Sequence, residues 1–238
     1  MRVALAMAVL MVLGAACVPA PAAVERKVDR LPVVIVPGFE LTCGQNSRDW
    51  DAWVDALVDD GVPRSWVSVF NYDTCRPPEE ITEELGERVR AVVAATGAPR
   101  VRIIAHSLGS ILSRWCMRFG ECAGLVDTHL SLAPANHGTI WANLCPVAFW
   151  HRSCGAMTPD GPFLAALNAD DETWGDTRYV TASSWCDLAI VPSVWGTLEG
   201  AENHTLARCV EHSAWKVDPA AVTWGVATLA GRAVPPLA

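Results

Sequence analysis

VRIIAHSLG, residues 101–109, is the stretch that decides the fold. An apolar run of strand type, residues 101–105, leads directly into a Ser and then into residues 107–119, which have a helical pattern. Small residues two before and two after the Ser, here Ala105 and Gly109, allow strand and helix to approach closely at a nucleophile elbow. Ser107 would then project above the carboxyl edge of a sheet. The alternative is a Ser that merely caps the helix, and the strand before it and the helix after it favour the elbow.

The segments around this stretch alternate between strand and helix patterns. The run LPVVIV, residues 31–36, is apolar throughout, as in a strand covered on both faces. Trp50 and Trp53 recur at helical spacing and are expected in the core. The alternation predicts an α/β fold with a mainly parallel sheet of about six strands flanked by helices. We expect strands at 31–36, 66–72, 101–105, 125–133, 178–183 and 205–210, and helices at 50–58, 81–93, 107–119 and 218–229.

The first 22 residues have the pattern of a secretory signal peptide. Arg2 precedes an apolar run, residues 3–16, and small residues at 20 and 22 fit a cleavage site. A lipoprotein signal with Cys17 as the anchor is the alternative. Cleavage near Ala22 predicts a secreted chain with one domain at 23–238. The net charge of −8 argues against nucleic-acid binding, which needs a basic face.

The cysteine count agrees with export. Of nine cysteines, Cys17 falls in the leader, and an even set of eight remains. Such a set suggests up to four disulfides in an oxidising compartment. Spacing leaves the connectivity open; nearest neighbours in chain order is the simplest pairing, with 43–75 the most secure. Neither a zinc ligand pattern nor a dinucleotide loop is present in the sequence, so we expect no metal and no cofactor.

Four sequence blocks share a family resemblance. LPVVIVPGFE (31–40), IIAHSLGSILSRW (103–115), SLAPANHGT (131–139) and CDLAIVP (186–192) together resemble the secreted bacterial class 2 triacylglycerol lipase/esterase family of α/β-hydrolases. The resemblance extends over residues 31–229, with the blocks in the family's order. It implies the α/β-hydrolase fold and ester hydrolysis by Ser, Asp and His in that chain order.

Asp187 matches the acid of the resembled family. It follows the strand expected at 178–183 and precedes a short apolar run and a Pro. On position alone, an acidic residue there could equally be a turn former. Three other acidic residues precede the same strand and are expected at the surface, namely Asp170, Asp171 and Asp176.

His212 matches the family's catalytic base. It follows the strand expected at 205–210 and precedes the last helix, whereas the rival His204 precedes that strand. We expect His106, inside the elbow, to pack beneath the site and His137 to brace a loop. The proposed oxyanion donors are the backbone N–H groups of Leu108 and Phe39, although Pro37 stands where many relatives have His.

A long connection precedes the strand of the acid. We expect residues 139–175 to form an insert or cap over an acyl pocket, and the alternative is ordinary core beneath extra helices. Trp195, outside this insert, is a further candidate for lining the cleft. Within the insert, the candidate substrate-binding residues are Trp141, Phe149, Trp150 and Phe163.

The expected partner is an ester or lipid substrate, with transient contact at a lipid interface and a monomeric chain. Two alternatives remain open at this point. The same triad could act in acyl transfer or on another acyl bond, such as an amide, thioester or polyester. The chain could also be a non-catalytic secreted binding protein on a hydrolase scaffold.

Overall fold

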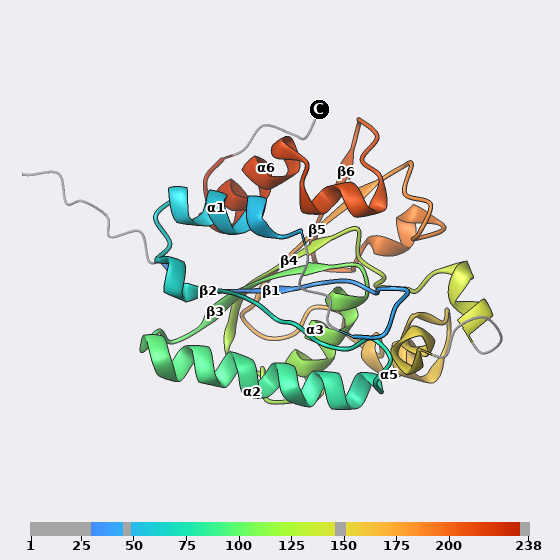
Figure 1. Ribbon diagram of the computed structural model, residues 1–238. Helices are drawn as coiled ribbons and strands as arrows, with labels where there is room; N and C mark the ends of the chain where they lie inside the picture. The colour runs from blue at the N-terminus through green and yellow to red at the C-terminus, as the bar shows by residue number, and fades with distance from the viewer. Residues whose placement is uncertain (1–29, 45–48, 146–150, 234–238) are drawn as a thin grey trace, which may run out of the picture.

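A six-stranded parallel sheet forms the centre of the molecule (Figure 1). The computed structural model describes residues 30–44, 49–145 and 151–233, so the predicted signal peptide lies outside the described residues. The strand order is β2-β1-β3-β4-β5-β6, and every neighbouring pair is parallel. The strands are β1 (Val33–Val36), β2 (Val67–Val69), β3 (Val101–His106), β4 (Val126–Leu132), β5 (Arg178–Ser184) and β6 (Glu202–Leu206).

Helices cover both faces of the sheet (Figure 1). Helices α1 and α6 pack on one face around Trp53, and α2, α3 and α5 lie on the other. The connection between β4 and β5 carries η2 and η3 as well as α5, so the expected insert has helical turns of its own. The α-helices are α1 (Asp51–Asp59), α2 (Pro78–Thr96), α3 (Leu108–Phe119), α5 (Pro162–Leu167) and α6 (Pro219–Leu229); the 3-10 helices are η1 (Arg64–Trp66), η2 (Ile140–Leu144), η3 (Arg152–Met157), η4 (Ser193–Gly196) and η5 (His212–Lys216).

These observations confirm the expected fold class, and the core is where the apolar runs predict it. Trp50 and Trp53 are 1% and 0% exposed. None of the helices in the described part of the chain combines the length and the apolar character needed to span a membrane.

The last strand was predicted at the wrong place. Residues 205–210 were expected, but β6 spans Glu202–Leu206, so His204 lies within the strand rather than before it. The physical reason is that β6 pairs only with β5, at the edge of the sheet, and four of its five residues are exposed or half-buried. A search for apolar runs therefore misses its polar sequence, ENHTL.

The eight cysteines within the described residues form four disulfides in chain order. The pairs are Cys43–Cys75, Cys116–Cys122, Cys145–Cys154 and Cys186–Cys209, which confirms nearest-neighbour pairing. Such a set is consistent with an extracellular protein.

Candidate active site

Ser107 occupies a sharp turn between β3 and α3. Its backbone has φ 53° and ψ −124°, a strained conformation for a residue with a side chain. A Cβ on Gly109 would collide with the carbonyl oxygens of Val36 and Pro37, so only glycine allows α3 to begin this close to β1. The Ser107 side chain thus sits at the carboxyl end of the sheet, as the elbow pattern predicts. Within the described residues, the hydroxyl of Ser107 has no hydrogen-bond partner.

The loop after β1 lies against the elbow. A Cβ on Gly38 would be 2.8 Å from the Cβ of Ser107, so glycine permits this approach. The hydroxyl of Tyr72 donates to the carbonyl oxygen of Pro37 at 2.7 Å and fixes the loop. Phe39 follows Gly38 in this loop, and Leu108 is the first residue of α3.

Asp187 and His212 form a hydrogen-bonded pair. Asp187 Oδ2 lies 2.8 Å from His212 Nδ1, and the Asp187 side chain is 2% exposed. Its second oxygen, Oδ1, accepts the backbone N–H groups of Ala189 at 2.8 Å and Ile190 at 2.9 Å. The carboxylate orientation is therefore set by the main chain, and it directs one oxygen to the imidazole.

His106 connects the elbow to the segment that carries His212. Its Nε2 lies 2.8 Å from the carbonyl oxygen of His212, and the two ring centroids are 4.6 Å apart. Burial, and then the neighbouring His212, lowers the pKa of His106 well below its usual value. A neutral His106 donates Nε2–H to that carbonyl. His212 therefore lies beside His106, the residue that directly precedes Ser107.

The segment carrying His212 is anchored at both ends. Cys209 is joined to Cys186, beside the acid, and the backbone N–H of Val210 donates to Ser184 Oγ at 2.9 Å. At the other end, Asp218 caps α6 by accepting the N–H of Ala221 and pairs with Arg208. The histidine is therefore held on a segment with little freedom.

The loop after β4 supports the loop after β5 that carries Asp187, called the acid loop below. Thr139 Oγ1 donates to the carbonyl oxygen of Ala189 at 2.7 Å and accepts the N–H of Val191 at 3.2 Å. These bonds join the SLAPANHGT block to the segment that follows Asp187. The SLAPANHGT and CDLAIVP blocks therefore contact each other in one part of the site.

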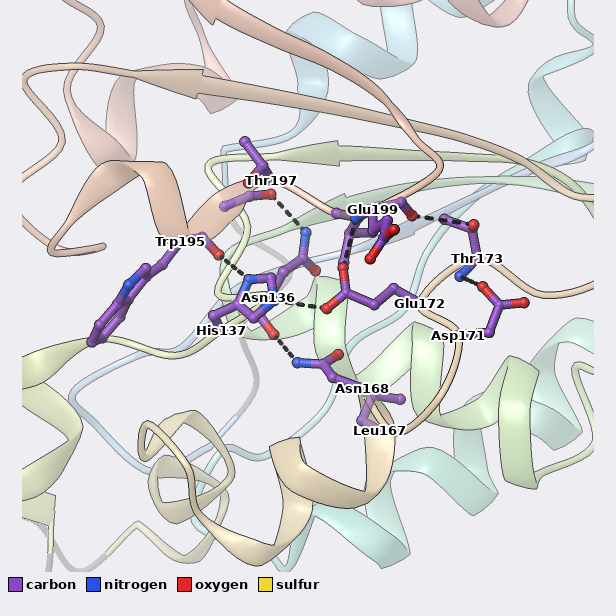
Figure 2. Close-up of polar contacts among 12 residues, drawn as sticks. Asn136, His137, Leu167, Asn168, Asp171, Glu172, Thr173, Trp195, Thr197 and Glu199 are labelled. Atoms are coloured by element: carbon purple, nitrogen blue, oxygen red, sulfur yellow. Dashed lines mark hydrogen bonds and ion pairs between the residues drawn. The ribbon is translucent and has the colours of Figure 1, made fainter.

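His137 braces the same loop, as predicted (Figure 2). Nδ1 faces the carbonyl oxygen of Trp195 at 3.1 Å, and Nε2 faces Glu172 Oε1 at 2.7 Å. Both partners are acceptors, so the doubly protonated imidazolium satisfies both contacts. The hydrogen bond with Glu172 raises the pKa of His137, and Glu172 Oε2 also accepts the N–H of Glu199 at 2.6 Å.

The predicted substrate-binding residues fall at different places. Trp141, 51% exposed, donates Nε1–H to the carbonyl oxygen of Leu188 at 2.8 Å and so lies beside the acid loop. Phe163 is buried against Trp115, with ring centroids 4.1 Å apart, and borders a separate hollow of about 400 Å³. Trp195 is half-buried in η4. The other two candidates, Phe149 and Trp150, lie outside the described residues.

Two apolar residues of the acid loop were not singled out from the sequence. Trp185 and Leu188 are 63% and 80% exposed and border a hollow next to His212. The available signal was the occurrence of large apolar residues on both sides of Asp187, in a loop outside every expected element.

Within the described part of the chain, one group of potential metal ligands comes together: Cys43, Cys75 and His151. The two sulfur atoms form a disulfide, so they are not thiolate ligands. The catalytic candidates contain no comparable set.

A parallel sheet of this order, with a Ser at the turn between its central strand and the following helix, defines an α/β-hydrolase. The family model "Lipase (class 2)" matches residues 30–216, and the chain belongs to that family. This family is one of carboxylic ester hydrolases of the serine hydrolase type.

Solved structures agree with the fold. Aspergillus fumigatus lipase B is similar with a TM-score of 0.68 at 16% identity over 89% of this chain, which spans 55% of the length of that protein. The mature form of the Bacillus licheniformis lipase BlEst2 has a TM-score of 0.65 at 13% identity over 84% of this chain and 91% of its own. No curated protein sequence matches this chain.

Proposed function

We propose that this protein is a secreted lipase or esterase in which Ser107, Asp187 and His212 form a catalytic triad. The observation that carries the proposal is the 2.8 Å bond between Asp187 and His212, next to a Ser on a strained elbow. Each of the three side chains lies on a separate loop at the carboxyl edge of the sheet, where α/β folds place their sites. The proposed domain is 23–238, with an insert at about 139–175.

In the proposed mechanism, His212 Nε2 takes the proton of Ser107 as the Ser oxygen attacks the ester carbonyl. Asp187 holds Nδ1–H, which fixes the tautomer, and it stabilises the imidazolium that forms. A hydrogen bond between Ser107 and His212 would form when substrate binds, because catalytic hydrogen bonds are often long or poorly aligned before that step. Protonation of the leaving oxygen releases the alcohol, and water then cleaves the acyl-enzyme through the same base.

The oxyanion of the tetrahedral intermediate would be bound by the N–H groups of Phe39 and Leu108. Support comes from the approach of the loop after β1 to Ser107 and from the position of Leu108 at the helix N-terminus, where the dipole favours negative charge. Each such donor is typically worth about 3 kcal/mol of the barrier.

Trp141 and Phe163 are proposed to contact the substrate from the insert. Trp141 has the clearer support, because its bond to Leu188 sets it beside the acid loop. Secretion is proposed from the leader pattern and the four disulfides.

The test is hydrolysis of p-nitrophenyl butyrate by Ser107→Ala and a matched control, Ser110→Ala. Ser110 lies one turn along α3, and its buried hydroxyl has no hydrogen-bond partner within the described residues. We expect Ser107→Ala to lower kcat by about 10⁴ or more, and Ser110→Ala to leave it nearly unchanged. A Ser107→Ala protein that folds normally and keeps a tenth of the activity refutes the proposal.

A chain-length series of p-nitrophenyl esters then separates lipase from esterase. A maximum at long acyl chains assigns a lipase, and a maximum at short chains assigns an esterase.

A further inference from the structure

A hollow of about 760 Å³ lies next to His212, which is one of its lining residues. Its walls come from the loop after β5 and the loop after β6. They include Trp185, Leu188 and Glu211, and the disulfide Cys186–Cys209 lies between them. This hollow is distinct from the one that Phe163 borders, with which it shares no lining residue.

The walls of the hollow are preformed. The disulfide ties the two loops together, and Trp185 Nε1–H donates to the carbonyl oxygen of Ala207 across them, at 3.3 Å. The bond from Trp141 fixes the main chain of Leu188. A ligand that enters would therefore order few side chains, so little binding energy is lost to conformational entropy.

The chemistry of the walls favours a neutral, apolar group. Trp185 and Leu188 both line the hollow, and they are 63% and 80% exposed. Among the described residues that line the hollow none is Lys or Arg, whereas Glu211 contributes a negative charge. A carboxylate or phosphate would be repelled, and an uncharged aromatic or aliphatic group would remove apolar wall surface from water.

The proton transfers in the proposed mechanism decide which half of the ester, acyl or alcohol, lies next to His212. The carbonyl oxygen would face the proposed backbone donors, the N–H groups of Phe39 and Leu108. The leaving oxygen must face His212 Nε2, because that nitrogen gives it a proton. The group attached to the leaving oxygen therefore extends from the imidazole of His212, a residue that lines the hollow.

We propose that the hollow bounded by Trp185 and Leu188 is the subsite for the alcohol part of the ester, and that it selects neutral alcohols with an aromatic or aliphatic group. The proposal rests on the triad of the proposed function. The same subsite serves the reverse step: the O–H of an alcohol gives its proton to His212 Nε2 while its oxygen bonds to the acyl carbon. The bond from that carbon to Ser107 Oγ then breaks, and Oγ takes the proton from His212.

The test isolates the alcohol side by using one acyl-enzyme throughout. p-Nitrophenyl butyrate forms the butyryl-enzyme, and benzyl alcohol or methanol then competes with water for it. The products, butyrate ester and butyric acid, give the partition ratio for each alcohol. We expect Leu188→Ala and Trp185→Ala each to lower the partition to benzyl alcohol by about five- to tenfold, through the lost apolar contact, and to leave methanol unchanged.

Phe119→Ala is the matched control, because Phe119 is a large side chain, 52% exposed, at the far end of α3. It should leave both partition ratios as in the wild type. Urea unfolding of all three variants checks that the fold is retained. Because Leu188→Ala and Trp185→Ala, the two wall variants, are independent, the test still gives a result if one of them fails to fold.

Each result has one meaning for the proposal. Unchanged partition to benzyl alcohol in both wall variants overturns it, and so does an equal fall for methanol, which would indicate disturbance of His212. A changed preference among acyl chain lengths would assign the hollow to the acyl part instead. If the wild-type chain forms no acyl-enzyme, the proposed function itself fails; an acyl-enzyme with unaffected partition refutes the subsite alone.

Discussion

Asp187→Asn removes one charge and leaves the shape of the site intact. In the native chain, Oδ1 accepts two backbone N–H groups, from Ala189 and Ile190, and Oδ2 accepts Nδ1–H of His212. The carboxamide of Asn has one acceptor oxygen and one NH₂ donor. Its oxygen is required at the two N–H groups, so its NH₂ must face His212.

The opposite orientation is costly. It would place NH₂ against two backbone donors and leave both without an acceptor, which costs about 1–3 kcal/mol for the buried N–H of Ile190 alone. The favoured orientation donates to His212 Nδ1, which moves the imidazole proton to Nε2. That nitrogen can then no longer accept the proton of Ser107.

We therefore expect kcat/KM for p-nitrophenyl butyrate to fall by about 10⁴, as is typical when a triad histidine is held in the wrong tautomer. Asp176→Asn is the control, because the Asp176 side chain is 90% exposed and lies before β5. Circular dichroism and urea unfolding should show a native fold for both variants. A folded Asp187→Asn enzyme within tenfold of wild-type activity would refute this account of the acid.

Three further predictions concern stability and support of the site. Gly109→Ala should destabilise the fold by about 1–3 kcal/mol in urea unfolding, because its Cβ meets two backbone carbonyls; an unchanged midpoint would contradict the close approach. Burial, and then Arg114, lowers the pKa of His129 to about 3, so the unfolded chain binds a proton below pH 6.5 that the folded chain does not. The contribution of His129 to stability should therefore be complete above pH 6.5 and fall toward pH 3, by up to about 1.4 kcal/mol per pH unit, and a His129→Gln protein should show a shallower slope. Glu172→Gln removes the carboxylate that raises the pKa of His137. It should lower kcat more than it changes KM, and it should abolish any loss of stability as pH rises above 6.5. Kinetics and pH profiles equal to those of the wild type would show that the contact between His137 and Glu172 does not act on the acid loop.

The parts of the fold that follow from local chemistry were predictable from sequence. The β3–Ser107–α3 elbow needs small residues at fixed positions, and Gly109 indeed has no room for a Cβ. Buried parallel strands such as β1 are apolar throughout and can be located directly. The edge strand β6 was misplaced because its solvated residues carry no such pattern.

The partners of Ser107 depend on contacts distant in sequence. Position alone left Asp187 open as a turn former, and only the family resemblance favoured it. In the structure its oxygens accept two backbone N–H groups and one imidazole, which supports the proposed role as the acid. The alcohol-side hollow could not be predicted, because Trp185 and Leu188 lie in a loop whose shape depends on a disulfide to Cys209.

Covalent labelling tests the central claim most directly. A fluorophosphonate reacts with a serine only where a base has activated it, so peptide mass spectrometry of the labelled protein identifies the nucleophile. We predict one label per chain, on the peptide that contains Ser107, and its loss in His212→Ala at unchanged fold. A label on another serine, or none on the folded wild-type protein, would contradict the account.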